Sequence, residues 1–251
     1  RRLNLMTRDT PIFRPRRIAA IAALTALFGG FAQAAPSEVV PLSDSVGQEL
    51  KNGVIYQVGA TRTLDANNSW AISALKVAPG ATAALYIPQG RTLTVIGNNY
   101  FNFGNTGTVW KGGTLDLQVG TVLLGNPTFE GGAENNIFFS GPKWQFWSLT
   151  TPIPWSVTFK KETTLELGES LVSGAYSTNC NIFAGPFKFE NNVTIHGYSG
   201  KLNPGRCMTF AGPVSGAGKI LYLGAYNPQV YFAHANTFHG LSIAASAASD
   251  T

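Results

Sequence analysis

The acidic side chains are the first candidates for chemistry in this sequence, because glycosidases act with a pair of Asp or Glu residues. The 251 residues include only 13 Asp and Glu, and no Asp-Asp or Asp-x-Asp pair occurs. Asp116 and Glu166 each stand between two leucines, which predicts that both point outward into solvent. A polysaccharide-active enzyme would instead need these two acids to converge on one face with Glu130 and Glu134.

The two cysteines, Cys180 and Cys207, are 27 residues apart, and each stands three residues before a phenylalanine, Phe183 or Phe210. Because each cysteine stands at the same distance from a repeat phenylalanine, we predict that the two cysteines occupy equivalent positions on adjacent coils, close enough for a disulfide. An oxidising compartment would favour that bond, and a reduced stacked pair is the alternative. The histidines are scattered without ligand spacing, so the sequence predicts no metal site and no cofactor.

Three of the five tryptophans, Trp144, Trp147 and Trp155, fall within twelve residues, beside Pro152 and Pro154. Exposed aromatic rings stack on sugar rings as they do on other flat apolar faces. The three tryptophans are therefore candidate ligand-binding residues, which would lie exposed on one surface. The alternative, which the sequence leaves open, is that the rings pack inside the core or within a loop.

From Leu42 onward, the sequence consists of short segments in which apolar and polar residues alternate, separated by Gly, Pro and Asn. These segments must position the acidic, cysteine and tryptophan side chains. In most segments the outer residues are apolar and the middle one is not, which is the pattern of a strand with one buried face. Glycines often follow and supply the positive φ that tight turns require. Examples are Leu93-Thr94-Val95, Leu115-Asp116-Leu117, Leu165-Glu166-Leu167, Val193-Thr194-Ile195 and Leu221-Tyr222-Leu223.

Two families of strands repeat along the chain. Leu167, Ile195 and Leu223 follow one another at intervals of 28 residues. A second family has phenylalanines at intervals of 30, 24, 27 and 28 residues, namely Phe129, Phe159, Phe183, Phe210 and Phe238. Repeats of this length indicate a solenoid, in which each unit buries its apolar face against its neighbours. We therefore predict an all-β fold, a right-handed parallel β-helix with coils of roughly 22–28 residues.

Residues 1–34 have the composition of a secretory signal peptide with a few upstream residues. Basic residues precede an apolar run from Ile18 to Phe31, and Ala32-Gln33-Ala34 gives the small-x-small exit that a signal peptidase needs. We expect residues 35–75 to form an N-terminal cap or first coil, and residues 76–251 to form the β-helix, truncated at its C-terminus. Without the leader, the net charge of +5 falls to zero, so we expect no nucleic-acid partner. No second apolar run is long enough to span a membrane, so we expect no transmembrane segment in the mature part.

Near the C-terminus, Ser215–Gly224 followed by Ala235–Ile243 resembles the passenger-associated β-strand repeat of bacterial autotransporters. That family alternates Gly-x-Gly, a strand ending in Gly, and Asn-Thr-aromatic-x-Gly with another strand. This chain departs from the pattern by inserting Asn227-Pro228 and by lacking the second Thr-rich strand. The resemblance implies a β-helical surface protein that is exported across the outer membrane of a Gram-negative bacterium.

These observations together predict a non-enzymatic, exported passenger or stalk segment of a bacterial surface protein, secreted or at the cell surface, with a role in adhesion or display. Its expected partners are surface glycans or host and cell-surface proteins, and the chain is expected to be monomeric. Two alternatives stay open: a polysaccharide-active β-helix enzyme, either a lyase or a hydrolase, and a secreted carbohydrate-binding module.

Overall fold

The computed structural model describes residues 38–42, 50–51, 53–97, 100–104, 106–146, 152–167, 181–197, 207–223 and 229–244. The chain divides after Ala34 into two units, and every described residue belongs to the second. These residues form 23 strands and no helix, and every strand pair is parallel. The fold is therefore an all-β parallel solenoid of about seven turns, as the sequence predicts.

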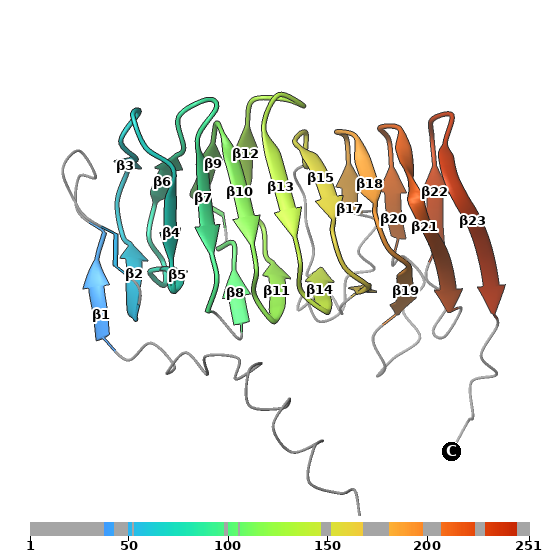
Figure 1. Ribbon diagram of the computed structural model, residues 1–251, viewed down its shortest axis with the longest axis horizontal. Coiled ribbons are helices and arrows are strands. Elements are labelled where there is room, and N and C mark those ends of the chain that lie inside the picture. Colours follow the sequence, from blue (N-terminus) through green and yellow to red (C-terminus); the bar gives the residue numbers. More distant parts are fainter. Residues whose placement is uncertain are drawn as a thin grey trace, which may run out of the picture. The chain divides into compact units, whose positions relative to one another are not determined.

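Most turns of the solenoid place strands on three faces, and Figure 1 shows the strands of successive turns side by side from β1 to β23. The first face holds β4 (Trp70–Ile72), β7 (Thr92–Val95), β10 (Thr114–Leu117), β13 (Asn136–Phe139), β15 (Ser156–Phe159) and β18 (Phe187–Phe189). The second face holds β1 (Glu38–Pro41), β2 (Val54–Val58), β5 (Ala74–Val77), β8 (Tyr100–Asn102), β11 (Thr121–Leu124), β14 (Lys143–Phe146), β16 (Thr163–Leu167) and β19 (Val193–Gly197).

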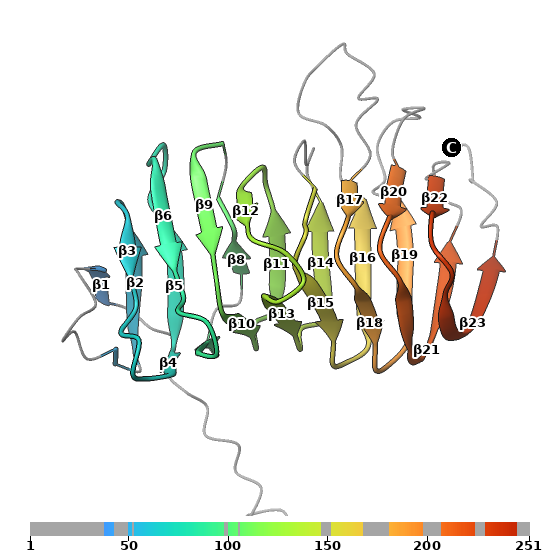
Figure 2. The same cartoon turned by 90° about the horizontal axis from the view of Figure 1, so that it is seen from above.

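The third face is divided into two sheets, and the view in Figure 2 shows both of them. One sheet contains β3 (Arg62–Thr63), β6 (Ala83–Tyr86), β9 (Thr108–Lys111) and β12 (Thr128–Glu130). The other contains β17 (Asn181–Phe183), β20 (Cys207–Phe210) and β22 (Gln229–Phe232). The long strands β21 (Val214–Leu223) and β23 (Thr237–Ala244) run across the first and second faces and join them into one sheet.

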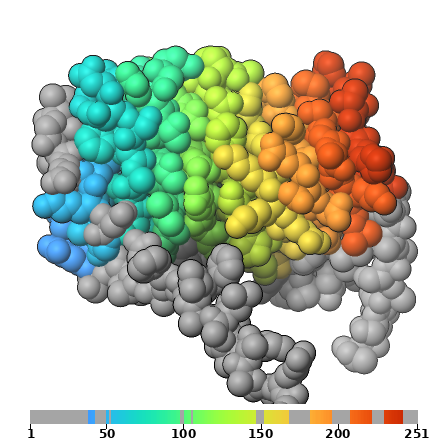
Figure 3. Space-filling model, in the orientation of Figure 1, coloured from blue at the N-terminus to red at the C-terminus, as the bar shows by residue number. Residues whose placement is uncertain are grey.

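The register explains why residues far apart in sequence lie in contact. On the first face Leu93 pairs with Leu115, and Leu115 pairs with Ile137, each 22 residues further along. All three side chains are buried, so one turn stacks its apolar residues on those of the next, about 4.8 Å away. On the surface, the successive turns follow one another as bands of colour from blue to red (Figure 3).

The repeat is less regular than the sequence intervals of 28 residues indicate. Leu165 pairs with Ile195 at an offset of 30 residues, and Ile195 pairs with Tyr222 at an offset of 27. Leu167 pairs with Gly197 and not with Ile195. The predicted equivalence of Leu167 and Ile195 is therefore wrong by two residues, because the coil between β16 and β19 is longer than those before it.

The phenylalanine family also divides between faces. Phe129, Phe183 and Phe210 lie on strands of the third face, whereas Phe159 and Phe238 lie on strands of the first face. Phenylalanines at similar intervals therefore belong to two faces, because a strand with an inward Phe has the same sequence pattern on either face.

A column of aromatic rings occupies the interior of the solenoid. Phe103 stacks on Trp144 with ring centroids 5.9 Å apart, and Phe183 stacks on Phe210 at 5.5 Å. Phe210 stacks in turn on Phe232 at 5.2 Å. Each such pair contributes about 0.5–1.5 kcal/mol beyond the burial of its surface. The aromatic residues therefore hold successive turns together from within.

Candidate functional site

The tryptophan cluster does not form an exposed surface. Trp144 and Trp155 are both fully buried, with 0 % of their surface exposed. Trp144 lies between Phe103 and Phe146, at centroid distances of 5.9 and 5.8 Å. The expectation that these two tryptophans lie exposed is wrong, because inward positions of β14 and of the segment before β15 place both rings in the core. Trp147 lies outside the described residues.

The predicted disulfide falls partly outside the described residues, because Cys180 is not among them, whereas Cys207 begins β20. The backbone register pairs Asn181 with Met208, an offset of 27 residues. This offset equals the separation of the two cysteines in the sequence. The disulfide stays a prediction.

Asp116 on the first face is buried, contrary to the expectation of a solvated position. Only 9 % of its surface is exposed. Gln118 Nε2 donates to Asp116 Oδ2 at 3.0 Å, and Lys160 Nζ lies 3.8 Å from Asp116 Oδ1. Lys160 also lies 4.1 Å from the ring centroid of Phe138, the outward neighbour of Asp116 on β13. Phe138 on the next turn and Lys160 above its ring cover the carboxylate of Asp116.

Glu166 on the second face is also buried, at 5 % exposure, so its predicted solvated position is wrong as well. Gln145 stands beside it in the register of β14 and β16, and its Nε2 donates to Glu166 Oε2 at 2.6 Å. Lys143 Nζ lies 3.3 Å from the same oxygen. The preceding turn thus supplies both a hydrogen-bond donor and a positive charge to this carboxylate.

A third charged group lies on the third face, where Tyr86, Lys111 and Glu130 follow one another on β6, β9 and β12. Lys111 Nζ lies 3.0 Å from Glu130 Oε2 and 4.7 Å from the ring centroid of Tyr86. The hydrogen bond with Glu130, and then that with Tyr86, raises the pKa of Lys111 above its usual value. The lysine therefore stays charged between an anion and an aromatic face.

The four acids considered for catalysis do not converge. Asp116, Glu166 and Glu130 lie on the first, second and third faces respectively. Glu134 lies in the turn after β12, where the backbone N–H of Gly132 donates to its Oε1 at 2.8 Å and lowers its pKa. Within the described ranges, no group of three or more His, Cys, Asp or Glu residues could hold a metal ion.

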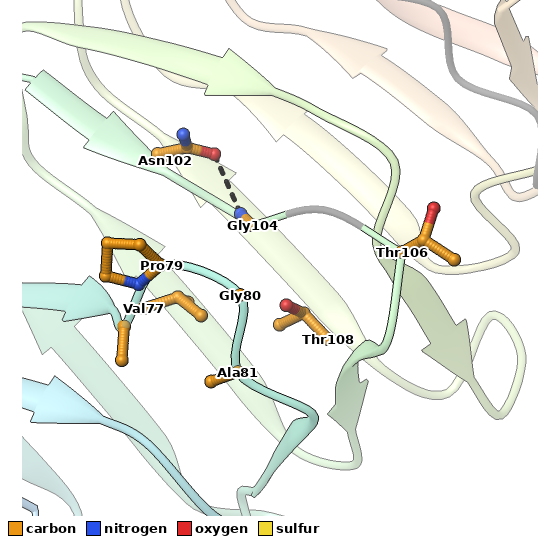
Figure 4. Close-up of a pocket in the computed structure, with 9 residues that line it drawn as sticks. Val77, Pro79, Gly80, Ala81, Asn102, Gly104, Thr106 and Thr108 are labelled. Carbon is orange, nitrogen blue, oxygen red and sulfur yellow. Dashed lines mark hydrogen bonds between the residues drawn. The ribbon is translucent and has the colours of Figure 1, made fainter.

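A small hollow of about 210 Å³ lies between the turns of two successive coils (Figure 4). One wall is the turn after β5, from Val77 to Ala81, and the other is the loop after β8. The side chains of Asn102, Thr106 and Thr108 come from this second wall. This hollow was not predicted from the sequence, although its polar residues stand close together between Asn102 and Thr108.

Internal hydrogen bonds shape the second wall of the hollow. The backbone N–H of Gly104 donates to Asn102 Oδ1 at 2.8 Å. From the next turn, Asn126 donates its backbone N–H to the Gly104 carbonyl at 3.2 Å and its Nδ2 to Thr106 Oγ1 at 3.3 Å. Gly104 has φ +93°, and a Cβ there would lie 2.5 Å from Thr108 Oγ1, so only glycine fits.

The chemistry that the hollow can offer follows from its lining. None of the nine residues that line it is titratable, and its polar side chains are one amide and two hydroxyls. Such groups bind neutral ligands through hydrogen bonds, while Val77 and Pro79 provide apolar contact. Its volume is below the roughly 300–1,000 Å³ of sites for drug-sized ligands, so it suits a single small group.

Comparison with known proteins found no relative: no protein-family model, no curated protein and no solved structure matches the chain. Among the described residues, no helix has the length and apolar character needed to cross a membrane.

Proposed function

We propose that this chain is a non-enzymatic β-solenoid segment of an exported bacterial surface protein, which acts in adhesion or display. The observation that supports this function best is that three acidic side chains lie beside lysines of other turns. Asp116, Glu130 and Glu166 each lie near a lysine that is brought by another turn, at 3.8, 3.0 and 3.3 Å. The acids thus contribute to joining coils, which is what a rigid scaffold requires.

The enzyme alternative depends on a pair of carboxylates near one substrate. The four acids offered for that role are divided among three faces and the turn after β12, an arrangement that does not favour a shared substrate. The predicted leader and the resemblance to an autotransporter repeat support export to the cell surface. Surface glycans or cell-surface proteins remain the proposed partners.

The hollow between the turns favours the carbohydrate-binding alternative as a second function. It replaces the buried tryptophans as the candidate glycan contact, because its amide and hydroxyl groups match the hydroxyls of a neutral sugar. Thr108 lies between the Pro79–Ala81 turn and Gly104 and is only 4 % exposed, so the accessible polar groups of the hollow are the half-buried Asn102 and the exposed Thr106 (Figure 4). A single sugar residue of a longer glycan is the ligand that its volume suits.

Export is tested by expressing the full chain in a Gram-negative host. Cleavage by a protease added to intact cells is the expected result for surface display. Purified protein should release no reducing ends or unsaturated products from a panel of polysaccharides. Polysaccharide turnover that disappears in both Asp116→Asn and Glu166→Gln would contradict the non-enzymatic proposal.

Glycan binding is tested with the purified full chain on an array of neutral glycans. Thr106→Val keeps the shape of the exposed side chain and removes its hydroxyl, so affinity should fall about tenfold, as expected for one lost hydrogen bond. Thr158→Val, on the first face away from the hollow, is the matched control and should bind as the wild type does. Equal binding by both variants would exclude the hollow as the glycan contact.

A further inference from the structure

We infer that Asn67 is an acceptor for an N-linked glycan, in the exposed turn between β3 and β4. The turn reads Asp65-Ala66-Asn67-Asn68-Ser69, which contains the acceptor pattern Asn-x-Ser with a residue other than proline at x. This is a modification of the scaffold and goes beyond its proposed role in adhesion or display.

The turn presents the acceptor side chain to solvent. Ala66, Asn67, Asn68 and Ser69 are all exposed, and none of them belongs to a strand. The nearest strands end at Thr63 and begin again at Trp70. An enzyme can therefore enclose these residues without breaking a strand pair.

Local hydrogen bonds give the turn its shape. The backbone N–H of Asn67 donates to Asp65 Oδ1 at 2.9 Å, and Asn68 Nδ2 donates to Asp65 Oδ2 at 2.7 Å. Arg91 Nε from the next turn donates to the Ala66 carbonyl at 2.6 Å. Ser69 Oγ also accepts a hydrogen bond from the backbone N–H of Thr92 at 3.1 Å. All four bonds are exposed to solvent, so water can replace them when an enzyme draws the turn out.

A second segment of the sequence has the same pattern and provides an internal comparison. In Glu190-Asn191-Asn192-Val193-Thr194, an acid again stands two residues before the asparagine, and Thr takes the place of Ser. As unfolded peptides, the two segments therefore present a transferase with a carboxylate, an asparagine and a hydroxyl side chain at the same spacing. They are the two Asn-x-Ser/Thr patterns in the sequence that have no proline at x.

The fold holds the second segment in place. Val193 is fully buried and begins β19, where it pairs with Thr163 on one side and Ile220 on the other. Asn192 Oδ1 accepts a hydrogen bond from the backbone N–H of Lys219 at 3.1 Å, so its amide lies against the next turn. Asn192 itself is exposed, but Val193 and Thr194 are paired within β19, so an enzyme that encloses this Asn-x-Thr segment must unpair the strand. Enclosing Asn67 and Ser69 requires only the opening of an exposed turn.

The transfer uses a glycosyl diphosphate, such as a lipid-linked oligosaccharide, as donor and a separate oligosaccharyltransferase as catalyst. Asn67 Nδ2 attacks the anomeric carbon of the donor, and a C–N bond forms as the bond from that carbon to the diphosphate oxygen breaks. The diphosphate leaves with the bonding electron pair, and a base of the transferase takes one amide proton. No oxidation or reduction occurs.

The experiment uses the purified, folded full chain, incubated with a bacterial oligosaccharyltransferase and its lipid-linked donor, so its result does not depend on export or adhesion. Intact-mass measurement and glycopeptide mapping should find one glycan, on Asn67. Asn67→Gln should remove the added mass completely, whereas Asn192→Gln should leave it unchanged. Ser69→Ala should lower modification at least tenfold, and Ser69→Thr should restore it.

Heat-unfolded chain in the same mixture should be modified at both Asn67 and Asn192, which would show that the fold makes the selection. Two results would overturn the inference. One is an unmodified Asn67 in the folded chain, in a mixture that modifies a standard acceptor peptide. The other is equal modification of Asn67 and Asn192 in the folded chain.

Discussion

The indole N–H of Trp155 donates a hydrogen bond to the backbone carbonyl of Glu130, 2.9 Å away and 25 residues earlier in the chain. The same indole contacts Phe129 edge to face, with ring centroids 5.4 Å apart. Trp155 therefore joins two successive turns through both a polar and an apolar contact. These two contacts explain why Trp155 lies in the core and not exposed to a sugar.

The hydrogen bond of Trp155 can be measured by comparing two substitutions. Trp155→Phe keeps an aromatic ring but leaves the carbonyl of Glu130 without this donor. Trp144→Phe is the matched control, because Trp144 is equally buried and its indole N–H has no hydrogen-bond acceptor within the described structure. We expect Trp155→Phe to lower the free energy of unfolding by about 1–2 kcal/mol more than Trp144→Phe does, in urea denaturation. Equal losses would show that the bond contributes nothing.

The buried ion pair on the second face should stabilise the fold more than an exposed one. Lys143→Met leaves Glu166 buried without its cation, so we expect a loss of about 1–2 kcal/mol, below the 3–5 kcal/mol of fully buried pairs because Lys143 is 40 % exposed. Lys188→Met is the control, since Lys188 and Glu190 pair at 3.0 Å with both side chains exposed. Its effect should be about 0–1 kcal/mol. Chemical denaturation at low salt measures both, and a larger loss for Lys188→Met contradicts the prediction.

Gly185 stands at a corner where the backbones of two turns come close together. A Cβ at this position would lie 2.2 Å from the carbonyl oxygen of Trp155, which belongs to the preceding turn. Gly185→Ala should therefore destabilise the fold by about 1–3 kcal/mol or more. Gly59→Ala is the control, because its Cβ would meet only the Cβ of Ala78 at 3.8 Å, an ordinary contact. Thermal unfolding should show a lower midpoint for Gly185→Ala and an unchanged or higher one for Gly59→Ala.

The strands and their buried sides could be predicted from sequence, because a two-residue period depends on one strand alone. Leu115 and Leu117 are both buried, as their alternation with Asp116 indicates. The register could not be predicted in the same way. Phe159 and Phe183 occur in similar short motifs, yet β15 lies on the first face and β17 on the third. The length of each coil decides the face, and turns and insertions set that length without a fixed motif.

The functional residues were harder to predict than the fold, because their exposure depends on neighbours that the register brings together. Asp116 is covered because Phe138 follows it on the next turn and Lys160 reaches over that ring. Neither residue is near Asp116 in sequence. A cluster of tryptophans likewise has the same composition whether its rings face solvent or the core. The burial of Trp144 and Trp155 becomes visible only once their strands are placed.

The carboxyl of Asp65 should titrate below its usual range in the folded protein. Hydrogen bonds from the Asn67 backbone and then from the Asn68 side chain lower its pKa, because both favour the charged form. A depressed folded pKa means that this stabilisation is present above the unfolded pKa and is lost as the pH falls through the folded pKa. Asn68→Ala should therefore raise the pKa of Asp65 towards its usual value, as followed by the NMR shift of the carboxyl carbon. The pKa of Glu134, which the backbone of Gly132 lowers independently, should not move in that variant. A pKa of Asp65 that is unchanged by Asn68→Ala would show that the side-chain hydrogen bond does not hold this turn in solution.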